Sequence, residues 1–310
     1  MVGGQRCFDP VPDTWNRMLE ILMFWASKGI DAFRCDMAEM VPVEFWDWAV
    51  SRVKKKYRKI QFIAEIYNPG SYWDYINRGH FDYIYDKVGL YDTLRAITEG
   101  RESATAITRC WQQNGFNGPH MLHFMENHDE QRIASRFFGG TAQKGRPAMI
   151  VSALMDTCPV MVYSGQEVGE PGMDREGFSG LDGRTTIFDY WAPDTITRLY
   201  NDGRWDDARL TPDERELRAF YSTLLNICNN EHAISNGKFF DLMYVNPLSE
   251  SFNPHKQYAF LRADGKETIL VVTNFSDQPL NTAINIPQHA FDYMELKAQD
   301  GVKVKDLLSG

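Results

Sequence analysis

Two hydrophobic periods alternate along the chain as far as about residue 236. Segments with helical spacing occur at residues 15–28, 45–57, 71–78, 91–100, 103–114 and 147–155. Between them lie short apolar runs at residues 30–35, 60–66, 81–85, 121–125 and 159–163. The run at 60–66 is almost continuously apolar, as in a strand that is covered on both faces. This alternation predicts an α/β fold built on a parallel sheet or barrel over residues 1–236.

The pattern changes after residue 236. Two alternating runs surround Asp264 and Gly265 in KQYAFLRADGKETILVVTNFS, which is a strong hairpin signal. The segment LNTAINIP is expected to continue this hairpin. We therefore predict that residues 237–310 form a small antiparallel β-domain.

Two further segments complete the region before residue 236. Residues 165–210 have no clear period and are rich in glycine, aspartate and aromatic residues. A long irregular segment of this kind is usually functional, for example as a lid or a binding loop. A helix is then predicted from Thr211, with Pro212 in its first position and Glu214 completing a capping box.

Composition narrows the class of protein. The 310 residues are 43% hydrophobic and 24% charged, which is typical of a soluble globular protein with one large and one smaller domain. A net charge of −9 argues against nucleic acid or an anionic membrane as the partner. No apolar run reaches the roughly 18 residues of a membrane span. The start MVGGQRCFDP has no signal-peptide pattern, so the sequence leaves the compartment open.

The five cysteines are scattered and include no C-x-x-C pair. They indicate neither a zinc site nor a disulfide framework. We predict no metal ligands from the residues themselves.

Three acidic residues stand where apolar runs end: Asp36, Glu65 and Asp129. The ends of parallel strands gather at one rim of a barrel, and a pair of carboxylates around a sugar bond is the machinery of glycoside hydrolysis. Arg34 shares a strand face with Asp36, and a guanidinium nearby favours the ionised carboxylate that a nucleophile needs. Burial of Glu65 among apolar groups would favour its protonated form, as a general acid requires.

Asp129 follows two further polar residues, Asn127 and His128. His128 can donate to a sugar hydroxyl, and Asp129 can oppose developing positive charge. Taken singly, each of these acids has an ordinary alternative: a loop or capping residue for Asp36, a surface residue for Glu65, and a surface pair for His128 and Asp129. Three such sites in order at matching strand ends favour the functional interpretation.

These segments resemble the motifs of the alpha-amylase superfamily of glycoside hydrolases. GIDAFRCDMAEMV is similar to its fourth-strand motif, FIAEIYNP to its fifth, FMENHD to its seventh, and CPVMVYSGQEVGE to its eighth strand and following turn. The resemblance implies a (β/α)8 TIM barrel with a C-terminal antiparallel β-sandwich domain. It implies a retaining mechanism with Asp36 as nucleophile, Glu65 as general acid/base and Asp129 as transition-state stabiliser. Arg34 would orient Asp36, and His128 would bind a hydroxyl of the cleaved sugar.

Two departures from the family pattern stand out. Nothing before Asp36 matches the third-strand motif, so we expect a C-terminal part of the barrel that lacks its first three strands. The segment that usually binds calcium follows that third strand, so the family's Ca2+ site lacks its usual ligands in this sequence. Glu39 and Met40 stand where many amylases have Lys-His, a pattern closer to neopullulanases and cyclomaltodextrin-cleaving enzymes.

The expected partner is an α-glucan. Trp191 in the irregular segment could stack on a sugar ring or pack within its loop, and the two interpretations are equally supported. Arg184 could reach substrate, although a role in a glycine-rich turn is simpler. Hydrolysis, transglycosylation and non-catalytic carbohydrate binding all stay open, as does the choice between α-1,4 and α-1,6 bonds.

Overall fold

Five short parallel strands form one sheet in the order β1-β2-β3-β4-β5. The computed structural model describes residues 8–172, 181–185, 187, 193–297 and 301–309. The strands are β1 Ala32–Cys35, β2 Gln61–Ala64, β3 Tyr83–Tyr85, β4 Met121–Phe124 and β5 Val160–Met161. All four neighbouring pairs are parallel, which confirms the predicted α/β class.

The chain divides into two units, and each is described by itself. Unit 1 contains residues 1–88 and 120–122, and unit 2 contains residues 89–119 and 123–310. Strand β4 belongs to both: Met121 and Leu122 pair with β3, whereas His123 and Phe124 pair with β5.

Helices in unit 1 follow the predicted alternation. They are α1 Asp13–Ala26, α2 Val43–Lys56 and α3 Tyr72–Asn77. Helix α2 buries Phe45, Trp46 and Val50 and ends in three lysines, which suit the negative end of a helix. Trp25 on α1 is 51% exposed.

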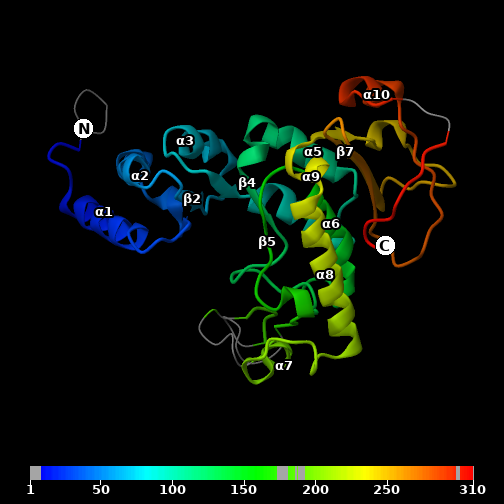
Figure 1. Ribbon diagram of the computed structural model, residues 1–310, viewed down its shortest axis with the longest axis horizontal. Coiled ribbons are helices and arrows are strands. Elements are labelled where there is room, and N and C mark those ends of the chain that lie inside the picture. The colour runs from blue at the N-terminus through cyan, green and yellow to red at the C-terminus, as the bar shows by residue number, and fades with distance from the viewer. Residues whose placement is uncertain (1–7, 173–180, 186, 188–192, 298–300, 310) are drawn as a thin grey trace. The chain divides into compact units, whose positions relative to one another are not determined.

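Helices in unit 2 contribute to two separate hydrophobic clusters. They are α4 Asp92–Thr98, α5 Ala106–Asn114, α6 Arg146–Leu154, α7 Asp194–Tyr200, α8 Pro212–Asn230 and α9 His232–Asn236. Helix α8 runs beside α6 (Figure 1). The capping box is confirmed, since the Glu214 amide donates to Thr211 Oγ1 and the Thr211 amide donates to Glu214 Oε2. Helix α7 lies inside the segment predicted to be irregular.

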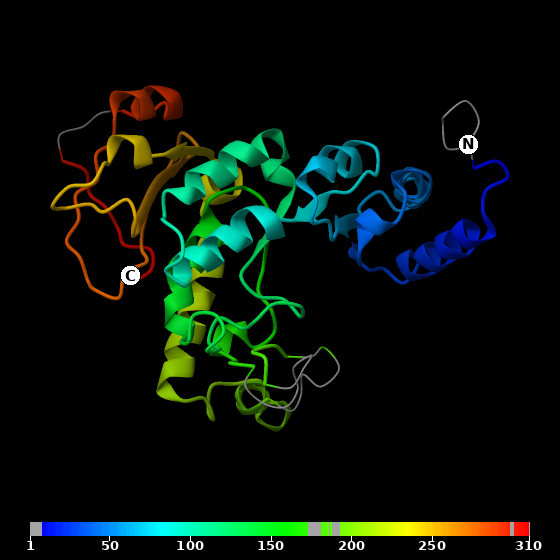
Figure 2. The ribbon, with the colours of Figure 1, turned by 180° about the vertical axis from the view of Figure 1, so that it is seen from behind.

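A second sheet follows α9. Strands β6 Lys238–Asp241, β7 Gln257–Ala263 and β8 Thr268–Asn274 are antiparallel, and β7 and β8 form the predicted hairpin around Asp264 and Gly265. Helix α10 Gln288–Met294 packs on β6 (Figure 2). Residues 281–287 form no strand, so the expected continuation of the hairpin is wrong. The domain boundary at residue 237 stays a prediction.

Strand β7 contributes the most buried part of this sheet. Tyr258, Ala259 and Phe260 are fully buried and join the core that α6 and α8 build. Arg262 is also fully buried, and its guanidinium donates to backbone carbonyls of Met155, Ile234 and Gly237. Among the helices that the structure describes, none combines the length and apolarity needed to cross a bilayer.

Candidate active site

Asp36 and Glu65 leave the sheet at the same edge. Cys35 at the end of β1 pairs with Ala64 at the end of β2, so the next residue of each strand is the predicted carboxylate. The Arg34 guanidinium contacts both acids: Nη1 lies 2.5 Å from Asp36 Oδ1, and Nη2 lies 3.1 Å from Glu65 Oε2. The second contact is an ion pair without hydrogen-bond alignment. One cation thus holds two carboxylates from neighbouring strands.

The two carboxylates differ in their exposure to solvent. The Asp36 side chain is 75% exposed, whereas the Glu65 side chain is 5% exposed. Glu65 is therefore not the surface residue of the alternative interpretation, and polar groups contact both of its carboxylate oxygens. Its Oε1 accepts from the Tyr67 hydroxyl at 2.7 Å, and its Oε2 accepts from the Met37 amide at 2.8 Å. The structure therefore gives Glu65 a fixed orientation, which a proton donor at a glycosidic oxygen requires.

Tyr67 was not predicted as a site residue. It lies two positions after Glu65, and residues two apart share a face of an extended chain, so this spacing could have revealed it. Met37 provides its amide from a left-handed backbone conformation with φ of 45°, which is uncommon for a residue with a side chain.

Glu39 and Tyr85 support this cluster from either side. The Glu39 carboxylate accepts from the amides of Tyr67 and Asn68, each at 3.2 Å, and so holds the loop that follows Glu65. The Tyr85 hydroxyl accepts from Arg34 Nε at 3.4 Å. Burial of Arg34 opposes its charge, but Tyr85, Asp36 and Glu65 outweigh burial and raise the pKa of the guanidinium.

Asp129 and His128 belong to unit 2, on the loop after β4. His128 Nε2 lies 3.2 Å from Asp129 Oδ2, and both side chains are partly exposed. Asn127 is buried, and its Oδ1 accepts from the amides of Asp129 and Glu130, each at 2.9 Å. The Asn127 oxygen is therefore used inside the loop, and a contact of Asn127 with substrate would have to use its amide nitrogen, which is itself buried.

Arg184 lies in a local turn with Asp182. The Arg184 amide donates to Asp182 Oδ1 at 3.0 Å, and Arg184 Nη1 lies 3.6 Å from Asp182 Oδ2. This geometry fits the simpler of the two interpretations of Arg184, a role in a turn. Trp191 lies outside the residues that the structure describes.

The family resemblance raises the question of a metal site. Within the described residues, no three His, Cys, Asp or Glu side chains form a group that could hold a metal ion. No step of the chemistry is assigned to a metal ion.

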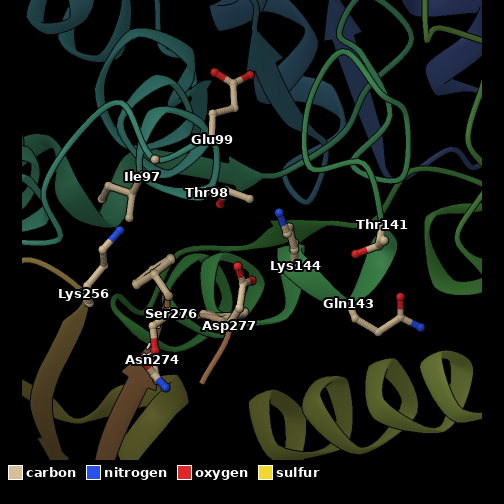
Figure 3. Close-up of a pocket in the computed structure, with 13 residues that line it drawn as sticks. Ile97, Thr98, Glu99, Thr141, Gln143, Lys144, Lys256, Asn274, Ser276 and Asp277 are labelled. Atoms are coloured by element: carbon tan, nitrogen blue, oxygen red, sulfur yellow. Dashed lines mark hydrogen bonds between the residues drawn. The ribbon is translucent and has the colours of Figure 1, made fainter. Parts of the chain in front are cut away.

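A cavity of about 490 Å3 lies in unit 2, between the end of α4, the start of α6 and the end of β8. Figure 3 shows Lys144 and Lys256 directed from different elements toward the end of α4. None of the predicted site residues lines this cavity. This cavity therefore does not include the predicted carboxylates.

Comparison with known proteins identifies the family. Residues 11–209 match the model of the alpha amylase catalytic domain. The cyclomaltodextrinase of Bacillus sp is 24% identical over 271 residues, which are 85% of this chain and 42% of that protein. The alpha-1,4-glucan:maltose-1-phosphate maltosyltransferase of Mycolicibacterium smegmatis is 28% identical over 173 residues, which are 55% of this chain and 23% of that protein.

Solved structures share the fold. The alpha-amylase from H. orenii superposes with a TM-score of 0.63 at 19% identity, covering 87% of this chain and 56% of that chain. A cyclomaltodextrinase gives a TM-score of 0.60 at 21% identity, covering 85% and 40%. This chain spans about half, or less, of the length of these relatives. The match to the catalytic-domain model extends over most of the chain, and the chain therefore belongs to the alpha-amylase family.

Proposed function

We propose that this chain contributes the catalytic carboxylates of a retaining glycoside hydrolase that cleaves α-glucosidic bonds in starch-like α-glucans or maltooligosaccharides. The observation that carries the proposal is the shared guanidinium of Arg34, which contacts Asp36 and Glu65 together. A retaining enzyme needs two carboxyl groups about 5–5.5 Å apart, and two groups bound to one cation are close neighbours. The family membership supports the substrate class.

The two carboxylates have surroundings that suit different roles. Asp36 is exposed and paired with Arg34, so it can attack the anomeric carbon and form a glycosyl-enzyme. Glu65 is buried and oriented, so it can protonate the leaving oxygen and then take a proton from the water that releases the sugar. Asp129 would oppose the positive charge of the oxocarbenium-like transition state. His128, Asn127, Arg184 and Trp191 are proposed to contact the sugar.

The stereochemistry of the product tests this mechanism. Maltotriose cleavage is followed by 1H NMR, and we expect the product to retain the α-anomeric configuration. Glu65→Gln should lower kcat by at least about 10²-fold, because it removes the proton donor. Glu20→Gln, an exposed change on α1, is the control and should leave kcat unchanged. An inverted product, or a fully active Glu65→Gln variant, would contradict the proposal.

Transglycosylation is the second candidate, and one observation favours it. Several relatives of this chain are alpha-1,4-glucan:maltose-1-phosphate maltosyltransferases, which differ from hydrolases in the acceptor. The same glycosyl-enzyme would then react with a sugar hydroxyl in place of water. Oligomers longer than the maltotriose supplied would show transfer. Binding of maltotriose without any cleavage would instead support a carbohydrate-binding role.

A further inference from the structure

The loop that carries His128 and Asp129 is closed by a buried ion pair. Glu126 precedes these two residues and Arg132 follows them, and Arg132 Nη1 lies 2.7 Å from Glu126 Oε2. The two side chains are 2% and 1% exposed. The second carboxylate oxygen of Glu126 accepts from the Ile133 amide at 2.7 Å. His128 and Asp129 therefore lie within a seven-residue segment, 126–132, whose two ends are fixed to each other.

Arg132 also connects this loop to two other segments of unit 2. Its Nη2 donates to the Ser164 carbonyl at 2.8 Å, in the turn after β5, and its guanidinium lies 4.1 Å from the centre of the Tyr163 ring. Nε and Nη2 donate to Thr185 Oγ1 at 2.9 and 2.6 Å. The Arg132 amide donates to the Gly183 carbonyl at 2.6 Å. One side chain thus joins the loop after β4, the turn after β5 and the segment that contains Asp182 and Arg184.

The energetics favour a geometric role over a stabilising one. Removing two charges from water costs several kcal/mol per ion, so a buried pair adds little net stability compared with apolar residues of similar size. Its directional hydrogen bonds, however, permit few alternative arrangements of the three segments. Neither Glu126 nor Arg132 has the solvent access needed to contact a sugar directly.

We propose that Arg132 is a positioning residue, which through Glu126 and Thr185 fixes the His128–Asp129 loop against the segment at residues 183–185. This inference rests on the proposed glycosidase function for its kinetic consequence. The physical coupling between the loop and that segment does not depend on activity. A loop held at both ends can place Asp129 precisely, and a misplacement of about 1 Å can cost a catalytic site about 10²-fold in rate.

The test removes one hydroxyl from the network and keeps its shape. Thr185→Val deletes the acceptor of two guanidinium N–H groups, while Thr185→Ser keeps that acceptor and deletes only a methyl group. Thr273→Val is the matched control, because Thr273 is buried to the same 2% and its hydroxyl donates to a backbone carbonyl within the β7–β8 hairpin. Hydrogen–deuterium exchange of residues 126–133, kcat and KM on maltotriose, and the melting temperature are measured for each variant.

We expect Thr185→Val to speed exchange at the Asp129 and Glu130 amides and to lower kcat about tenfold or more, with KM changed less. In Thr185→Ser the exchange rates and kcat should stay within about twofold of the parent values. Thr273→Val should leave the exchange rates and kcat unchanged. A purely packing role predicts the reverse order, with serine worse than valine, and that order would overturn the proposal. Unchanged exchange in Thr185→Val would overturn it as well. If the parent chain shows no cleavage, the glycosidase proposal fails, and the exchange measurement still decides the coupling.

Discussion

Arg34 and Arg132 each bind a glutamate near the end of a parallel strand, but the two ion pairs differ in their access to solvent. The Arg34 side chain is 26% exposed, and its second partner, Asp36, is 75% exposed. The Arg132 side chain and its partner Glu126 are almost fully buried. The first arrangement leaves a carboxylate free to meet a ligand, whereas the second leaves nothing for a ligand to reach. The same residue types can therefore serve chemistry in one place and geometry in the other.

The largest expected effect on activity is at Asp36, the exposed partner of Arg34. Asp36→Asn should abolish the nucleophile and lower kcat/KM by at least about 10³-fold. Stability should change by about 1 kcal/mol or less, because a pair with an exposed carboxylate contributes little. Glycoside hydrolysis and thermal unfolding are measured together. Asp13→Asn, an exposed change on α1, is the control. An equal loss of rate in that variant would contradict the role of Asp36 as nucleophile.

Arg132→Met should, unlike Asp36→Asn, lower the stability of the fold strongly. Leaving Glu126 buried without its cation is expected to cost about 3–5 kcal/mol of unfolding free energy. Arg209→Met removes an exposed arginine that pairs with Asp202, and it should cost about 1 kcal/mol or less. Urea unfolding of both variants measures the difference. Equal costs would show that burial does not separate the two kinds of pair.

The same variant has a definite pH dependence. Burial raises the pKa of Glu126, and Arg132 and the Ile133 amide oppose that rise. Without Arg132 the pKa should rise further, so the folded protein holds a proton that the unfolded chain releases above about pH 4.3. Stability of Arg132→Met is then lost as pH rises through the raised pKa. The gap between parent and variant should be larger at pH 8 than at pH 4.5, and a gap that shrinks over this range would contradict this account.

Gly183 belongs to the segment that Arg132 contacts, because its carbonyl accepts from the Arg132 amide. Its φ is 81°, and a Cβ there would lie 2.7 Å from Ser135 Oγ and 2.9 Å from Ser135 Cβ. Gly183→Ala should therefore cost about 1–3 kcal/mol for strain, and the clash should add to that cost. Gly265→Ala is matched in φ, at 84°, but its Cβ would meet nothing within 4 Å. Calorimetry should show the larger loss for Gly183→Ala, and equal losses would remove the close approach from the explanation.

The smallest expected effect is at Met37, beside the exposed pair. Met37 has a left-handed backbone, which glycine adopts without steric cost. Met37→Gly should raise the unfolding free energy by about 1 kcal/mol or less, since relief of strain exceeds the entropy gained by the unfolded chain. Met40→Gly, close by on the chain but without a left-handed backbone, should lower it by a similar amount. Thermal melts distinguish the two signs.

Much of the fold was accessible from local pattern. The strands at residues 32–35, 61–64 and 121–124 lie inside the predicted apolar runs, and the capping box at Thr211 was predicted residue by residue. Hydrophobic period and capping chemistry are properties of neighbouring residues, so they can be seen without a structure. Two predictions were wrong because local pattern does not report tertiary contacts. Helix α7 forms in a segment whose composition predicted no helix, and residues 280–287 alternate like a strand but do not pair with one.

The candidate site was accessible in part. The register of β1 and β2 follows from the parallel fold, so Asp36 and Glu65 were expected at one edge. The polar surroundings of Glu65 were not expected, because Met37 is 28 positions from Glu65 in the sequence. Glu126 and Arg132 were missed as well, since two charged residues near a strand end give no sign in the sequence that they are buried.

The order of strands and helices, the resemblance to the family and the three carboxylates could be predicted without a structure. They depend on residue type and spacing, which the chain displays locally. Folding brings Arg34 between Asp36 and Glu65, and it brings Arg132 to Thr185, 53 positions away. Exposure decided which of these two arginines leaves a reactive group accessible, and exposure is a property of the packed molecule.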